Sequence, residues 1–136
     1  MPHDPRAVEA ARAWLGRARS NLALSKQEKP SEAVWEDLCF NAQQAAEKAL
    51  KSILTLRAID FPKTHDIEEL LDLLDKSGQS IPESLRKGDR LTQYAVELRY
   101  PFPETGEEVS EEDYRVAVAI AQEIVEWAEK VVGDEL

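Results

Sequence analysis

The sequence has 136 residues, a length at which one domain can bury a hydrophobic core without disulfides or metals. Its hydrophobic fraction of 43% and charged fraction of 32%, with only five glycines and seven prolines, exclude collagen-like and disordered chains. A single cysteine, Cys39, excludes an internal disulfide framework and a multi-cysteine zinc site. The longest apolar run is the six residues 116–121 and the N-terminus lacks a secretory pattern, so we expect no membrane span and a cytoplasmic location.

The formal net charge of -10 is unevenly distributed along the chain. Residues 104–136 contain 11 acidic and two basic residues, so the acidity belongs to the C-terminal segment. The net charge argues against broad electrostatic capture of nucleic acid, because phosphate contacts need a basic surface. A local basic patch remains open, for instance one formed by Arg86, Lys87, Arg90 and Arg99.

Helical periodicity predicts the first two elements. Asp4 followed by Pro5 is typical of a helix start, and apolar residues at helical spacing continue this helix to about Lys26. Ser31, after a proline, is the expected N-cap of the second helix, in which apolar positions alternate by four and three residues as far as Leu56. Its many alanines allow close approach of neighbouring helices, so we expect this helix at the centre of a bundle.

Two shorter segments follow a loop at residues 58–64, which contains a proline. Thr64 is the expected N-cap of a short third helix that ends at Gly78. A fourth helix is expected over residues 82–98, since Pro101 prevents its continuation.

The last helix is expected to begin with a capping box, Ser110 to Asp113, and to end before Gly133. Its apolar sector covers roughly half of the helix circumference, with Ile120 and Trp127 at one margin. A helix that packs against one neighbour needs a narrower apolar sector than this. We therefore expect Ile120 and Trp127 at the interface of a symmetric dimer. The predicted fold is all-α: a single domain, residues 1–136, forming an up-and-down antiparallel bundle of four long helices plus one short helix.

A polar row opposite the apolar stripe of the second helix is the first candidate site. Its members share a sector of about 120° by the helical period: Asn41, Gln44, Glu47, Lys48 and Lys51. In one interpretation they form a solvated face with Glu47 and Lys51 as an ion pair. In the other, the amides and lysines line a groove that binds a phosphate or a base edge.

Lys63 and His65 make up the second candidate, at the expected start of the third helix, where backbone N–H groups create a positive field. There His65 could act as a catalytic base or a phosphate ligand. Alternatively Thr64 and Asp66 cap the helix while His65 packs on the loop. Because the only other histidine, His3, lies in the N-terminal tail, no metal site and no cofactor are expected.

The third candidate combines Arg90, Tyr94 and Arg99, the last followed by Tyr100. Arginine can bind phosphate with two hydrogen bonds, and tyrosine can stack on a base. The structural alternative is an arginine at a helix C-terminus with an aromatic ring covering the edge of the core.

Three blocks in this order resemble the HEPN family, whose name stands for higher eukaryotes and prokaryotes, nucleotide-binding. They are Phe40-Asn-Ala-Gln-Gln-Ala-Ala-Glu-Lys-Ala-Leu-Lys51, then Lys63-Thr-His-Asp66, then Leu91-Thr-Gln-Tyr94 with Arg99-Tyr-Pro101. The resemblance spans about residues 10–130. It implies a helical bundle that commonly dimerises and is often encoded beside a minimal nucleotidyltransferase.

The resemblance also implies possible ribonuclease activity, because many members are metal-independent endoribonucleases with an arginine, four to six intervening residues and a histidine. Here Arg57 and His65 are separated by seven residues, so we expect little or no RNA cleavage. The function expected first is a homodimeric nucleotide- or RNA-binding module that acts with a separate nucleotidyltransferase, in a toxin–antitoxin or defence context. A ribonuclease using His65 and a purely structural, protein-binding bundle are the alternatives.

Overall fold

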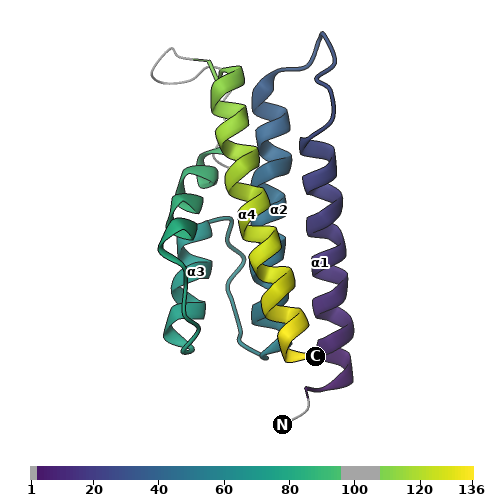
Figure 1. Cartoon of the computed structure of the whole chain (residues 1–136), viewed down its shortest axis with the longest axis vertical. Helices are drawn as coiled ribbons and strands as arrows, with labels where there is room; N and C mark the ends of the chain where they lie inside the picture. Colours follow the sequence, from purple (N-terminus) through teal and green to yellow (C-terminus); the bar gives the residue numbers. More distant parts are fainter. Residues whose placement is uncertain (1–2, 96–107) are drawn as a thin grey trace.

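The computed structural model describes residues 3–95 and 108–136, and every regular element within them is a helix. In chain order they are α1 (Pro5–Ser25), α2 (Trp35–Leu56), α3 (Ile67–Lys76), the 3₁₀ helix η1 (Glu83–Tyr94) and α4 (Glu111–Glu135). The long helices α1, α2 and α4 run side by side, while α3 and η1 form a shorter layer on the side away from α1 (Figure 1). The prediction of an all-α bundle is confirmed.

The start of α1 forms as the sequence predicts. The Asp4 carboxylate accepts a hydrogen bond of 2.8 Å from the backbone N–H of Arg6, and Pro5 occupies the first helical position. The helix ends at Ser25, one residue before the expected end. The start of α1 and the end of α4 lie at the same end of the bundle (Figure 1).

The start of α2 was predicted wrongly, since the helix begins at Trp35 and Ser31 does not cap it. The Ala33 N–H donates to the carbonyl of Pro30 and the Lys29 ammonium to the carbonyl of Ala33, which closes a turn before the helix can begin. The expected central position is correct, because α2 packs against all four other helices that the structure describes. Its alanines are fully buried: Ala42, Ala45, Ala46 and Ala49.

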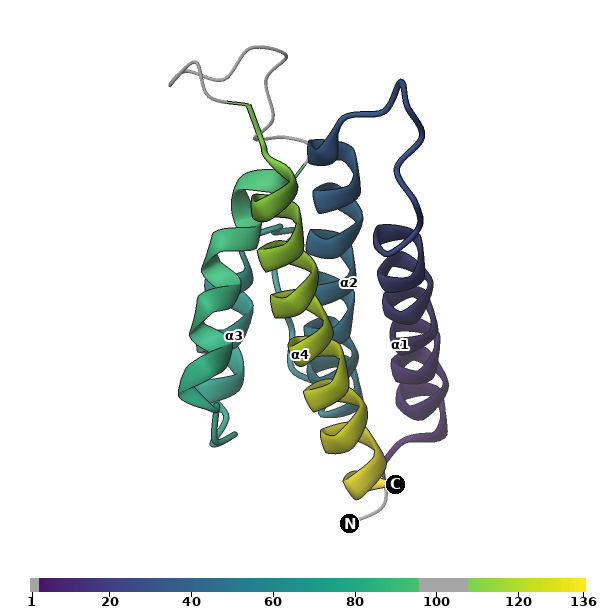
Figure 2. The same ribbon diagram turned by 45° about the horizontal axis from the view of Figure 1, so that its top comes forward.

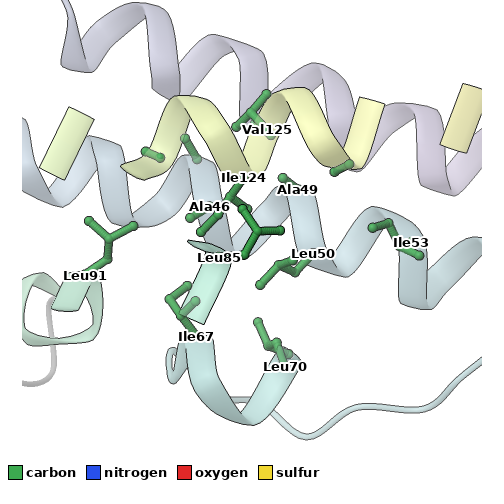
Figure 3. Close-up of a cluster of buried hydrophobic side chains, with 14 of the residues drawn as sticks. Ala46, Ala49, Leu50, Ile53, Ile67, Leu70, Leu85, Leu91, Ile124 and Val125 are labelled. Atoms are coloured by element: carbon green, nitrogen blue, oxygen red, sulfur yellow. The ribbon is translucent and has the colours of Figure 1, made fainter. Parts of the chain in front are cut away.

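A cluster of aliphatic side chains joins α2 to α3, η1 and α4. Figure 3 shows Leu50 of α2 facing Leu70 of α3 and Leu85 of η1, with Ile67 of α3 beside them and Ile53 further along α2. Each of these side chains is at most 1% exposed. Burial of this kind contributes roughly 1.5–3 kcal/mol per side chain, so this contact fixes the position of the short layer on α2.

The predicted fourth helix is shorter and more tightly wound than expected. It is a 3₁₀ helix of 12 residues, followed by an extended residue, Ala95. Its buried residues recur at every third position, Leu85, Gly88, Leu91 and Tyr94, which matches three residues per turn and not 3.6. The remainder of the predicted helix, to residue 98, lies outside the described residues.

Gly88 explains how η1 approaches its neighbours so closely. A Cβ atom at this position would lie 2.8 Å from Cγ2 of Ile67 and 2.9 Å from Cδ1 of Ile124, closer than carbon atoms pack. The absence of a side chain at Gly88 therefore lets η1 contact both α3 and α4.

The N-cap of α3 is Asp66 and not Thr64, so that prediction was wrong by two residues. The Asp66 carboxylate accepts from the backbone N–H of Glu69, and the Thr64 hydroxyl accepts from the backbone N–H of Asp66. As a result His65 precedes the helix and does not lie in its first turn. The predicted stop at Gly78 is confirmed, since this residue has the left-handed φ of 97°.

The capping box at the start of α4 is present as predicted. The Ser110 hydroxyl accepts from the Asp113 N–H at 3.1 Å, and the Asp113 carboxylate accepts from the Ser110 N–H at 2.9 Å. The helix continues through Gly133 to Glu135, slightly further than expected.

Candidate functional site

A buried polar network, here called the Glu47 cluster, consists of Gln43, Glu47 and Lys51 of α2 together with His65. Glu47 is 3% exposed and Lys51 8% exposed, so the interpretation of these two as a solvated pair was wrong. Phe61 and His65, from the segment between α2 and α3, cover this side of α2. The helical periodicity of α2 alone cannot show that another segment of the chain packs over its polar side.

Both carboxylate oxygens of Glu47 have partners. One oxygen accepts from the Lys51 ammonium at 2.9 Å, and the other lies 2.7 Å from Nδ1 of His65 and 3.0 Å from the Gln43 amide nitrogen. Burial raises the pKa of Glu47, but the hydrogen bonds from Lys51, Gln43 and His65 together lower it below the ordinary 4.5. Glu47 is therefore ionised at neutral pH. Its carboxylate accepts a hydrogen bond from the N–H at Nδ1 of His65.

Lys51 also lies between two aromatic rings. Its ammonium is 5.5 Å from the ring centroid of Trp14 in α1 and 5.6 Å from that of Phe61. Cation–π contacts of this kind stabilise a partly desolvated ammonium by about 0.5–2 kcal/mol each. The Glu47 cluster thus ties α1, α2 and the loop before α3 together.

A second set of polar side chains lies where α1 and α2 run side by side in both views (Figures 1 and 2). We call it the α1–α2 strip: Trp14, Arg17 and Asn21 of α1, and Asn41, Gln44, Lys48 and Lys51 of α2. The three α1 residues are three and four positions apart, so they share one helix face.

Hydrogen bonds connect the two helices along the α1–α2 strip. The Lys48 ammonium donates to the Asn21 side-chain oxygen at 2.8 Å, and the Asn21 amide nitrogen donates to the Asn41 oxygen at 3.2 Å. The Gln44 amide donates to Gln43 at 2.7 Å, which connects the strip to the Glu47 cluster. The structure therefore brings Asn41, Gln44 and Lys48 together in one hydrogen-bonded strip.

Lys48 has a positive electrostatic environment in a protein of net charge -10. Partial burial lowers its pKa below the ordinary 10.5, and the nearby Arg17 and Lys51 lower it further, while Glu47 has the opposite effect. The side chain of Arg17 is exposed. An anion bound between Arg17 and Lys48 would relieve this repulsion between like charges.

His65 and Lys63 lie beside the Glu47 cluster. The His65 side chain is 36% exposed, so its ring reaches both the buried carboxylate and the surface. Lys63 is exposed two residues earlier in the same segment.

Arg90 and Tyr94 lie on another part of the molecule. They line a hollow of about 160 Å³ between η1 and α4, together with Asp113. Burial raises the pKa of Tyr94, and its hydroxyl pairs with Cys39, whose pKa burial raises to about 12. Cys39 and Lys48 are nine residues apart in α2, so they point to opposite sides of it.

Arg99, the remaining predicted ligand, lies outside the described residues. Arg57 of the proposed ribonuclease pattern is bound elsewhere, since its guanidinium pairs with the Glu135 carboxylate and with Gln79. Arg57 is ten residues beyond Glu47, about 15 Å along α2. The structure therefore keeps Arg57 away from the Glu47–His65 contact.

The two residues predicted for a dimer interface differ in exposure. Ile120 is only 6% exposed and packs within its own chain, whereas Trp127 is partly buried at the edge of the core. Val116 is 37% exposed and shares the α4 face with Trp127, three turns away.

The sequence interpretation missed four residues of these two networks, Trp14, Arg17, Asn21 and Gln43, and also Phe61, which covers the Glu47 cluster. The spacing of Trp14, Arg17 and Asn21 on one face of α1 was a signal that could have revealed three of them. Within residues 3–95 and 108–136, no three histidine, cysteine or carboxylate side chains group as a metal site. The helices of that part of the chain include none that is long and apolar enough to cross a membrane.

Comparisons with known proteins show which family model the sequence matches and which solved structures share its fold. The family model of the HEPN domain matches residues 11–131. A crystal structure of ST0689, an archaeal HEPN homologue, shares the fold with a TM-score of 0.69 and 23% identity over 90% of this chain and 97% of that one. TT1696 from Thermus thermophilus has a TM-score of 0.57 and 28% identity over 96% of both chains. A search of curated proteins found no match.

Proposed function

The chain belongs to the HEPN domain family, and on that premise we propose that it is a nucleotide- or RNA-binding module whose phosphate site is the α1–α2 strip. The observation that carries the proposal is the contact of Lys48 with Asn21, which places its ammonium one turn beyond Arg17 on the same face of α1, near enough for the charge of Arg17 to lower the pKa of Lys48. Cations and amide N–H groups are the donors that phosphate oxygens accept from.

The net charge of -10 shapes this proposal, because it limits long-range attraction of RNA. Binding then depends on the few local cations of the α1–α2 strip and on Lys63. We expect modest affinity that falls as salt is added, since each neutralised phosphate releases counterions.

A second copy of the chain and a separate minimal nucleotidyltransferase are the proposed partners, in a toxin–antitoxin or defence context. Val116 and Trp127 support the homodimer, since both remain partly exposed on one face of α4. The support for the nucleotidyltransferase partner is the resemblance to a family whose members are often encoded beside such an enzyme. Light scattering at micromolar concentrations should give about twice 15.3 kDa, and a persistent monomer would contradict the dimer.

Calorimetry with a mononucleotide and a short RNA tests the phosphate site. The double variant Arg17→Met with Lys48→Met should bind at least about tenfold more weakly and with a smaller salt dependence. Lys26→Met with Lys130→Met is the matched control, because it removes the same charge from exposed positions. Equal losses in the two double variants would mean that net charge, and not the α1–α2 strip, controls binding.

Ribonuclease activity is a second candidate function, which the contact between His65 and Glu47 favours. A buried carboxylate on Nδ1 orients the ring, as a general acid or base requires. Under the leading proposal, the purified protein in chelator leaves labelled RNA intact. Cleavage that is lost in both His65→Ala and Glu47→Gln would replace the leading proposal with this one. A protein with neither binding nor cleavage would be the structural, protein-binding bundle.

A further inference from the structure

A shallow hollow of about 210 Å³ lies on α1, next to the α1–α2 strip. Ala10, Ala13, Trp14 and Arg17 line it, so two of its four residues also belong to the strip. These residues lie within two turns of α1, and their spacing places them along one stripe of the helix surface.

The Trp14 indole is held in place from inside the protein and borders this hollow. The Lys51 ammonium, itself fixed by Glu47, lies 5.5 Å from the ring centroid. Ala10 and Ala13 are both exposed and carry only a methyl group, so they leave space beside the ring. A positioned aromatic ring bordering an open, shallow space suits a flat ligand that stacks on it.

Cations lie within one nucleotide length of this ring. Arg17 is three residues after Trp14, about 4.5 Å further along the helix axis. Lys48 contacts Asn21, one turn beyond Arg17 on the same face. The order along the surface is therefore an aromatic ring, a guanidinium and an ammonium.

We propose that the hollow is a base-stacking subsite, in which Trp14 takes the base of a nucleotide or single-stranded RNA residue whose phosphate binds Arg17 and Lys48. This inference rests on the proposed function and adds the class of ligand: a nucleotide with an unpaired base. Because every base has a flat face, the subsite discriminates little between bases. An inorganic anion uses only the cations.

Tryptophan fluorescence can measure binding at this position directly. In the variant Trp35→Phe with Trp127→Phe, Trp14 is the one remaining tryptophan. Adenosine 5′-monophosphate should quench its emission, and inorganic phosphate should compete without comparable quenching. Titration of both ligands, with adenosine as a third, separates the contribution of the base from that of the phosphate.

Two further variants test the subsite while the cations remain. Trp14→Leu removes the ring, and Ala13→Leu fills the hollow at an exposed helical position. In calorimetry each should weaken binding of adenosine 5′-monophosphate about tenfold, within the range for base–aromatic stacking, and leave phosphate binding unchanged. Trp14→Phe keeps an aromatic ring and should retain most of the affinity. It therefore tests the role of the ring even if Trp14→Leu loses binding through misfolding.

The outcomes distinguish the two proposals. If the monophosphate and inorganic phosphate bind equally well and Ala13→Leu weakens neither, the subsite is wrong while the phosphate site stands. If neither ligand binds the unaltered protein, the proposed function is wrong and the subsite with it. Binding of the monophosphate that depends on Trp14 and Ala13, with phosphate binding that depends on Arg17 and Lys48, supports both.

Discussion

The Glu47 cluster and the α1–α2 strip share Lys51 and the same turns of α2, yet they differ in burial and charge balance. Within the cluster, Glu47 is 3% exposed and accepts hydrogen bonds on both oxygens. Within the strip, Lys48 is half-buried, and this burial, followed by the like charge of Arg17, lowers its pKa. Neighbouring residues on one helix thus form a structural network toward the interior and a cationic surface outside, and residue type alone does not distinguish them.

The largest effect should come from breaking the Glu47 cluster. Glu47→Ala leaves the buried Lys51 ammonium without its carboxylate, and loss of one partner of a buried pair costs about 3–5 kcal/mol. We expect the free energy of unfolding in urea to fall by that amount. Lys48→Ala, one residue away, should cost about 1 kcal/mol, because it removes one hydrogen bond at a half-buried position.

A double-mutant cycle sharpens this difference. Adding Lys51→Met to Glu47→Ala removes the unpaired charge, so we expect a coupling of about 1–3 kcal/mol between the two positions. Simple additivity of the two changes would mean that the pair does not stabilise the bundle in the way described.

The loss of folding stability at low pH should depend on the Glu47 carboxylate. The pKa of Glu47 in the folded protein lies below its ordinary 4.5, so the group stabilises the fold fully above about pH 4.5 and loses this contribution as the pH falls through the lower, folded value. Unfolding followed by circular dichroism from pH 7 to pH 2 should therefore be less pH-dependent in Glu47→Gln than in the unaltered protein. Identical slopes would show that Glu47 is not the group responsible.

Local signals in the sequence predicted the ends of the bundle better than its middle. Asp4 with Pro5 and Ser110 with Asp113 cap their helices through contacts within three residues, so no knowledge of the fold was needed. The burial of Glu47 depends on His65, 18 residues away, and a helical period cannot indicate which segment covers a polar face.

The winding of η1 was missed for a different reason. Leu85, Gly88, Leu91 and Tyr94 repeat every three residues, but Gly88 carries no apolar side chain, so the repeat does not appear in the hydrophobic pattern of the sequence. Its role becomes visible only through Ile67 and Ile124, which approach it from other elements. Likewise Arg90 and Tyr94 fit a phosphate site by residue type, while the fold places them on the η1 side of α2.

A smaller effect is expected on the Lys48 ammonium. Arg17→Met removes a neighbouring positive charge, so the pKa of Lys48 should rise toward its ordinary 10.5. Titration of the lysine side chains by NMR measures this shift, and Lys26→Met should leave the Lys48 pKa unchanged. An unchanged Lys48 pKa in Arg17→Met would mean that the two side chains do not interact, which would contradict a shared anion site.

Mapping of the bound mononucleotide by NMR tests the central claim most directly. Addition of adenosine 5′-monophosphate to ¹⁵N-labelled protein should shift the resonances of Trp14, Arg17 and Lys48 at the α1–α2 strip. The resonances of Arg90 and Tyr94, on the η1 side, should change little. Shifts concentrated at Arg90 and Tyr94, with the strip unaffected, would contradict the account.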